Sequence, residues 1–282
     1  MKILLINPPN SGRSIPEENY GITSVKQIFR GEPLALEVLA GNLPDHDLEI
    51  LDLKVEPEGL SPALEQFSPD LVGVTGMTCE AQSMLKIAET IRRQSRATIV
   101  VGGVHASADP DFFNREEIDW IVVGLGKQSF RELVDALEQD DPTIDIAGVA
   151  RATPGTALQY RPRTYSCEDL AETMAPRYDL VEKYRSEYTL ESLGLELGFV
   201  NSAAGCPYDC SFCCISSLTG GTYLTAATDT VIRDIEMLQT PVVRLVDANT
   251  FGNPKHALAL ADAIEAAGIR KQFLADIRSD SV

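Results

Sequence analysis

Short β-branched runs alternate with amphipathic stretches through residues 1–140, and this alternation restricts the fold more than any other feature. The predicted strands are residues 2–6, 48–53, 71–75, 98–101 and 120–123. Helical periodicity covers residues 33–42, 80–94 and 128–139. Such a pattern is typical of a parallel sheet covered on both faces. We therefore expect an α/β fold with an amino-terminal flavodoxin-like (Rossmann-like) domain, whose ligands lie beyond the carboxyl ends of the strands.

A second βα series follows a proline-punctuated connector. We assign residues 1–140 to the first domain, 141–190 to the connector and 191–282 to the second series. Its expected strands are residues 195–202, 242–246 and 272–277, and its expected helices are 229–238 and 255–267. These supply about three of the eight units of a (β/α) barrel. Three parallel strands cannot close on themselves, so we expect a partial barrel and a fragment of a longer protein.

Four of the six cysteines fall within nine residues, at Cys206, Cys210, Cys213 and Cys214. So tight a group indicates metal binding rather than a disulfide framework, and it favours a reducing, cytoplasmic location. Spacings of four and three residues let Cys206, Cys210 and Cys213 hold a four-iron cluster and leave one iron open to an exogenous ligand. The alternative is a tetrahedral zinc site with Cys214 as the fourth thiolate.

Loops rich in small residues follow the third, fourth and fifth predicted strands. They contain Thr75 and Thr78, then Gly102 and Gly103, and then Gly124 with Gly126. Glycine permits close approach of the backbone to a bulky ligand, and hydroxyls bind its polar groups. The loop after the first strand lacks Gly-x-Gly-x-x-Gly, which argues against a dinucleotide.

Charge and hydropathy exclude other classes of partner. The chain contains 24 Lys and Arg residues and 42 Asp and Glu residues, which gives a net charge of −18. This balance repels phosphate backbones and anionic lipid, so we expect no nucleic-acid partner. No apolar run reaches roughly 18 residues, so we expect no integral membrane segment. The apolar run at residues 1–6 is too short for a signal peptide.

The motif Cys206-x-x-x-Cys210-x-x-Cys213, with Phe212 before the last cysteine, resembles the signature of the radical S-adenosylmethionine (SAM) enzymes. The resemblance implies a [4Fe-4S] cluster whose open iron binds SAM and whose electron cleaves it, with Phe212 against the adenine. The segment around Asp247 resembles an Asp-Asp-x-Phe-x-x-Asn pattern of the cobalamin-dependent branch, with Ala248 at the second Asp. The segment that contains Arg278 and Asp280 resembles the Arg-x-Asp ending of the third strand in the same branch. Asp247 and Arg278 are thereby implied as SAM contacts, while a cap on the next helix and a pair with a neighbouring acid are the alternatives.

The first domain resembles the cobalamin-binding domain that precedes the barrel in the same branch. The matching features are Asn7-Pro8-Pro9, the Gly-Gly-x-His loop ending at His105, and residues 124–127, which replace a Gly-Glu-Gly-Glu loop and lose both carboxylates. The implied cobalamin contacts are Asn7, Thr75, Thr78, Gly102, Gly103, His105, Gly124 and Gly126. The Asp-x-His-x-x-Gly motif that supplies a lower axial histidine in many cobalamin proteins is missing after the first strand. The alternative for His105 is a loop histidine bonded to backbone.

The family resemblance implies an enzyme that combines a [4Fe-4S] cluster, SAM and cobalamin. Its implied reaction is methylation of an unactivated carbon in a small molecule or a natural-product or lipid precursor, with flavodoxin or ferredoxin as electron donor. Two alternatives stay open: oxidation or ring formation with the same cofactors, and a metal- or corrinoid-binding module without turnover. No catalytic residue and no particular substrate follow from the sequence.

Overall fold

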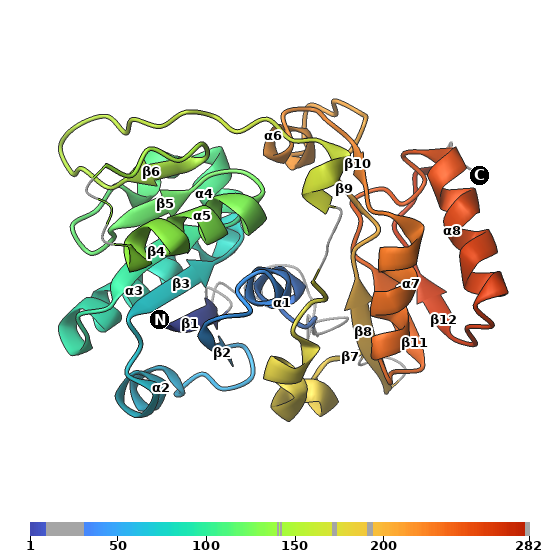
Figure 1. Cartoon of the computed structure of the whole chain (residues 1–282), viewed down its shortest axis with the longest axis horizontal. Helices are drawn as coiled ribbons and strands as arrows, with labels where there is room; N and C mark the ends of the chain where they lie inside the picture. The colour runs from blue at the N-terminus through green and yellow to red at the C-terminus, as the bar shows by residue number, and fades with distance from the viewer. Residues whose placement is uncertain (10–30, 140, 142, 171–173, 191–193, 280–282) are drawn as a thin grey trace, which may run out of the picture.

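The computed structural model describes residues 1–9, 31–139, 141, 143–170, 174–190 and 194–279. In that part of the chain, two sheets lie on either side of helix α1 (Leu34–Gly41). Figure 1 shows the first sheet with its helices at the left and the second at the right. Side chains of α1 join the cores of both halves: Leu36 and Ala40 pack with the first sheet, and Leu34 packs with the second.

The first sheet, within the described residues, has the order β2-β1-β3-β4-β5-β6. Its strands are β1 (Lys2–Asn7), β2 (Asp47–Asp52), β3 (Leu71–Thr75), β4 (Thr98–Gly102), β5 (Trp120–Val122) and β6 (Val149–Arg151). Strands β1 to β5 are parallel, in the flavodoxin-like order, and β6 is an antiparallel edge strand beside β5. The predicted α/β class and the flavodoxin-like domain are confirmed.

Helices cover both faces of this sheet, and their burial explains why they form. They are α2 (Leu60–Phe67), α3 (Ala81–Gln94), α4 (Val104–Ala108) and α5 (Gly126–Glu138), with 3-10 turns η2 (Thr78–Glu80) and η3 (Pro110–Phe113). Helix α3 buries Met84, Ile87 and Ile91, which lie three to four residues apart on one side. These side chains form one core with β1, β3 and β4, while α1 and α5 form a second core on the opposite face.

The second sheet has the order β12-β11-β8-β7 among the described residues. Its strands are β7 (Thr189–Leu190), β8 (Leu195–Val200), β11 (Val242–Leu245) and β12 (Gln272–Leu274). Strands β8, β11 and β12 are parallel, and β7 is antiparallel to β8. Helices α7 (Thr228–Met237) and α8 (Pro254–Ala266) connect the parallel strands and pack against each other.

Two strands of the second sheet end earlier than predicted, because their last residues bind across to other loops. We expected strands over residues 195–202 and 272–277. After β8, the backbone N–H groups of Ser202 and Ala203 donate to the carboxylate of Asp247 instead of to a neighbouring strand. After β12, the carbonyl of Asp276 accepts from the N–H of Thr250. These contacts gather the loops at the carboxyl ends of the strands.

The connector places further elements between the sheets. It contains the 3-10 segments η4 (Cys167–Leu170) and η5 (Tyr178–Glu187). Val181 and Tyr184 of η5, together with Tyr188 just before β7, pack into the first sheet's core. No helix among the described residues has the length and apolarity that crossing a bilayer requires.

Candidate functional site

The cysteines lie on a hairpin that follows β8. Strands β9 (Ala203–Ala204) and β10 (Leu224–Thr225) pair antiparallel and close a loop that includes the short helix α6 (Ile215–Leu218). Gly205 begins this loop with φ +81°, and a Cβ there would lie 2.2 Å from the carbonyl oxygen of Thr222. The loop therefore needs glycine both for its backbone conformation and for its close approach.

Cys206, Cys210 and Cys213 are free thiols of this loop. Cys206 and Cys210 are half-buried, Cys213 is exposed, and the N–H of Cys213 donates to the carbonyl of Cys210 at 2.9 Å. Within the described ranges, no three His, Cys, Asp or Glu side chains are gathered closely enough to hold a metal ion. Three free thiols on one loop have the donor chemistry of a thiolate-ligated cluster, and they converge only if the loop closes around it.

Of the predicted SAM contacts, Phe212 lies on this loop and Arg278 comes close to it. The guanidinium of Arg278, after β12, lies 3.7 Å from the ring centroid of Tyr208, and its Nη1 lies 3.9 Å from Cys210 Sγ. The structure thus brings a cation from the third parallel strand to the second cysteine. Phe212 is 90% exposed, so its ring is open to a ligand.

Asp247 anchors the start of the hairpin from the end of β11. Its carboxylate is buried and accepts from Ser202 N–H at 2.8 Å, Ser202 Oγ at 2.5 Å and Ala203 N–H at 2.7 Å. The expected alternative, a cap on the next helix, is not its role, because Asn253 caps α8 by accepting from the N–H of His256.

Tyr223 and Asn249 complete the contact between the hairpin and the loop after β11, and neither was predicted. The Tyr223 hydroxyl donates to the carbonyl of Asn249 at 2.9 Å. Burial, followed by the charge of Asp247, raises the pKa of Tyr223 to about 12, so the hydroxyl stays protonated at neutral pH. The Asn249 side chain is buried, and neither of its polar atoms has a partner among the described residues. A tyrosine in a loop gives no sequence signal that it will contact a residue distant in the same chain.

A cavity of about 390 Å³ lies between the two halves, at the carboxyl ends of the first sheet's strands. This volume falls in the usual range of small-molecule sites. Five predicted cobalamin contacts line it: Thr75, Gly102, Gly103, Gly124 and Gly126. From the second half come residues beside the cysteine hairpin, among them Asn201, Ala204 and Val246. The lining is mainly apolar, with Leu34, Val38 and Leu39 of α1 on one wall.

Asn7, Thr78 and His105 lie outside this lining. Asn7 is buried and donates through Nδ2 to Asp52 Oδ1 at 2.9 Å. Thr78 is exposed in η2. The His105 ring packs edge-on against Phe112 and Phe113, at centroid distances of 4.7 and 5.6 Å.

Four cavity residues come from the connector and were missed by sequence reasoning: Tyr165, Asp169, Leu170 and Pro176. The connector has no regular apolar periodicity, so no pattern indicates which of its side chains faces the cavity. Strand ends, in contrast, point to ligand sites through a general rule of α/β sheets.

One family model and several known proteins match the chain. Residues 23–134 match the family model described as B12 binding domain. An uncharacterized methyltransferase of Pyrococcus horikoshii is 28% identical over 99% of this chain and 60% of its own length. The hopanoid C-3 methylase of Methylococcus capsulatus is 29% identical over 90% of this chain and 50% of its own length. The chain thus spans about half the length of the curated relatives it matches.

Among solved structures, the radical SAM methyltransferase TsrM from Kitasatospora setae has the same fold. It superposes with a TM-score of 0.75 at 23% identity, covering 95% of this chain and 52% of TsrM. TsrM has also been solved with cobalamin and a [4Fe-4S] cluster bound.

Proposed function

We propose that the chain belongs to the cobalamin-dependent radical SAM enzymes and that it forms the cofactor-binding portion of a methyltransferase. The proposed reaction places a methyl group on an unactivated carbon of a small molecule. Relatives named as methyltransferase and methylase match across both halves of the chain, which supports methylation as the reaction.

One observation carries the proposal: a single cavity is lined both by the loops after β3, β4 and β5 and by residues at the base of the cysteine hairpin. Cobalamin held by the first sheet would therefore lie next to the loop that holds the cluster. Methyl transfer to a carbon made reactive by cleaved SAM requires this proximity. A cobalamin site and a cluster site on distant faces of the chain would not support this methyl transfer.

The residues fit the proposed cofactors as follows. Cys206, Cys210 and Cys213 would hold the [4Fe-4S] cluster, with Phe212 and Arg278 toward SAM, while the buried Asp247 would support the base of the hairpin. Thr75, Gly102, Gly103, Gly124 and Gly126, which line the cavity, would hold cobalamin. When bound, the cluster supplies the electron that cleaves SAM, and cobalamin supplies the methyl group.

The chain's own groups position and shield these cofactors. Asp247 fixes the backbone where the hairpin leaves β8, and the Arg278 guanidinium places positive charge beside Cys210. The apolar wall of α1 would limit the access of water to cofactors bound in the cavity. We also propose a reducing, cytoplasmic location, because four of the six cysteines fall within nine residues. We further propose a flavodoxin or ferredoxin as the electron donor.

The proposal is tested by cofactor analysis of the chain reconstituted anaerobically with ferrous iron, sulfide and hydroxocobalamin. We expect about four iron and four sulfide per chain together with one bound cobalamin. Stoichiometric zinc without sulfide would contradict the cluster. A product that gains the mass of a methyl group supports methylation, whereas a product that only loses hydrogens supports oxidation or ring formation instead.

A further inference from the structure

The connector segment 161–170, which we call the strap, joins the first sheet to the cysteine hairpin. Figure 1 shows the connector leaving β6 and running along the top of the view toward α6 and β10. At its far end, Leu170 packs against the core of the second sheet, and Cys167 Sγ lies 3.8 Å from Thr225 Oγ1 of β10. The strap thus touches both halves of the proposed site.

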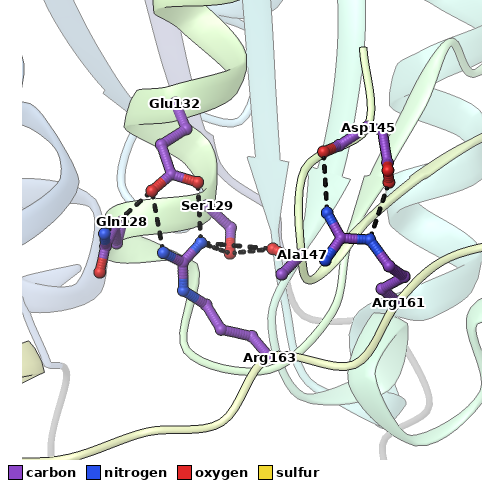
Figure 2. Close-up of polar contacts among 7 residues, drawn as sticks. All are labelled: Gln128, Ser129, Glu132, Asp145, Ala147, Arg161 and Arg163. Atoms are coloured by element: carbon purple, nitrogen blue, oxygen red, sulfur yellow. Dashed lines mark hydrogen bonds and ion pairs between the residues drawn. The ribbon is translucent and has the colours of Figure 1, made fainter.

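Arg163 fixes the strap to helix α5. Figure 2 shows its guanidinium facing the carboxylate of Glu132, with Nη1 and Nη2 each 2.9 Å from an oxygen. Nη1 also donates to Ser129 Oγ at 3.2 Å, and Gln128 holds Glu132 from the other side. A bidentate ion pair of this kind fixes the orientation of the guanidinium as well as its distance from the carboxylate. The backbone after Arg163 therefore starts from a defined position next to the cavity.

Tyr165, two residues later, lies directly on the loop after β5. Its hydroxyl oxygen accepts from the N–H of Leu125 at 2.9 Å. Gly124 has φ +87°, and a Cβ there would lie 1.9 Å from that oxygen. Burial raises the pKa of Tyr165 above its ordinary value, so the group stays a neutral hydroxyl. Both Tyr165 and the loop it touches line the cavity.

The Gly124 loop is linked in turn to the loop after β4. The N–H of Gly124 donates to Ser107 Oγ at 2.8 Å, and that hydroxyl donates to the carbonyl of Gly103 at 2.8 Å. A Cβ on Gly103 would lie 2.5 Å from Thr75 Oγ1, so the backbone at Gly103 also packs closely against the end of β3. Tyr165 is therefore the outermost member of a contact chain through three cavity-lining loops.

We propose that Tyr165 is a positioning residue of the cobalamin site, which preforms the loop at Gly124 and Leu125 for the corrinoid. The inference rests on the proposed function, since it takes cobalamin as the occupant of the cavity. A loop already held in its binding shape loses less conformational entropy when the ligand arrives. Removing the tyrosine oxygen leaves the Leu125 N–H without its acceptor and frees the loop.

The test is equilibrium dialysis of hydroxocobalamin against the wild-type chain, Tyr165→Phe and the matched control Tyr160→Phe. Tyr160 lies in the same connector but does not line the cavity. We expect Tyr165→Phe to weaken binding about tenfold and Tyr160→Phe to leave it within about twofold of wild type. Binding is measured well below each variant's unfolding temperature, so a loss of stability alone cannot change the dissociation constant. Equal affinity of Tyr165→Phe and wild type would overturn the inference and leave the proposed function intact.

Hydrogen exchange of the wild-type chain gives a second test that needs no variant. Added hydroxocobalamin should slow exchange in a peptide covering residues 124–127 and also in one covering 161–168. Slowing in the first peptide alone would overturn the inference. A wild-type chain that takes up no hydroxocobalamin would overturn the proposed function and the inference with it.

Discussion

The buried carboxylate of Asp247 accepts hydrogen bonds from both the N–H and the hydroxyl of Ser202, at 2.8 and 2.5 Å. These residues lie just past the ends of β11 and β8, two neighbouring parallel strands. Because Ser202 directly precedes the hairpin, Asp247, at the end of β11, fixes the point where the cysteine loop leaves β8. The position of Asp247 thus links the sheet to the proposed cluster site.

Asp247→Asn should loosen the cysteine hairpin. The amide oxygen can still accept from the N–H groups of Ser202 and Ala203, but the charge is lost and an NH2 group replaces the oxygen that accepts from the Ser202 hydroxyl. We therefore expect a loss of about 1 to 3 kcal/mol in the free energy of unfolding. Urea denaturation of the apo chain measures this loss, and iron and sulfide content should fall with it. Asp262→Asn, at an exposed site on α8, should change neither. An unchanged free energy for Asp247→Asn would show that the hairpin does not depend on this carboxylate.

Gly205→Ala should disrupt the base of the same hairpin. The new methyl group would meet the Thr222 carbonyl at 2.2 Å, in addition to the cost of positive φ in a residue with a Cβ. Gly220→Ala is the matched control, because Gly220 has φ +60° and a Cβ there would meet nothing within 4 Å. We expect Gly220→Ala to cost about 1 kcal/mol and Gly205→Ala at least about 2 kcal/mol more, measured by urea denaturation. Equal losses in the two variants would contradict the close approach at Gly205.

Arg278→Gln should weaken SAM binding to the reconstituted chain. The variant removes the cation that stacks on Tyr208 and points to Cys210, and with it a charge-assisted partner for the SAM carboxylate. We expect the dissociation constant from calorimetry to rise about tenfold or more. Arg270→Gln, at an exposed position, is the control. If both variants bind SAM like wild type, Arg278 does not contact it.

Glu37→Gln should stabilise the chain at neutral and alkaline pH. Glu37 is fully buried on α1, and its carboxylate oxygens have no partner among the described residues. Burial, followed by the charge of Glu32, raises the pKa of Glu37 well above its ordinary value. The folded chain therefore holds a proton that the unfolded chain releases, and Glu37 lowers stability as pH rises above its unfolded pKa of about 4.5.

Urea denaturation between pH 4 and pH 8 checks this pH dependence. The gain in unfolding free energy of Glu37→Gln over wild type should grow with pH and vanish below about pH 4.5. Glu58→Gln, at an exposed position, should show no such trend. A gain that does not depend on pH would mean that the glutamine acts through packing instead.

Periodicity predicted the first domain well because each parallel strand is a short buried run followed by an amphipathic helix. It missed α2, where Pro62 interrupts the pattern. Pro62 occupies the third position of that helix, in the first turn, where the N–H has no intrahelical acceptor to lose. Pro62, which in the sequence indicates the end of a helix, is therefore compatible with α2 at this position.

The candidate site was predictable only where it follows a local rule. Thr75 and Gly102 were predicted because strand ends gather at one edge of a parallel sheet. Asn7 follows the same rule, yet its side chain binds Asp52, since the local sequence does not determine the direction of a side chain. Tyr165 obeys no local rule, because its partner Leu125 lies 40 residues earlier in the chain.

The role of Cys206, Cys210 and Cys213 as cluster ligands is tested by measuring 5′-deoxyadenosine released from SAM by the anaerobically reconstituted, reduced chain and its cysteine variants. Cys206→Ser, Cys210→Ser and Cys213→Ser should each abolish release, because each removes a thiolate from the cluster. Cys214→Ser, at the exposed cysteine next to them, should release as much as wild type. Release that survives serine at any of the three positions, or that is lost equally in Cys214→Ser, would contradict the assignment.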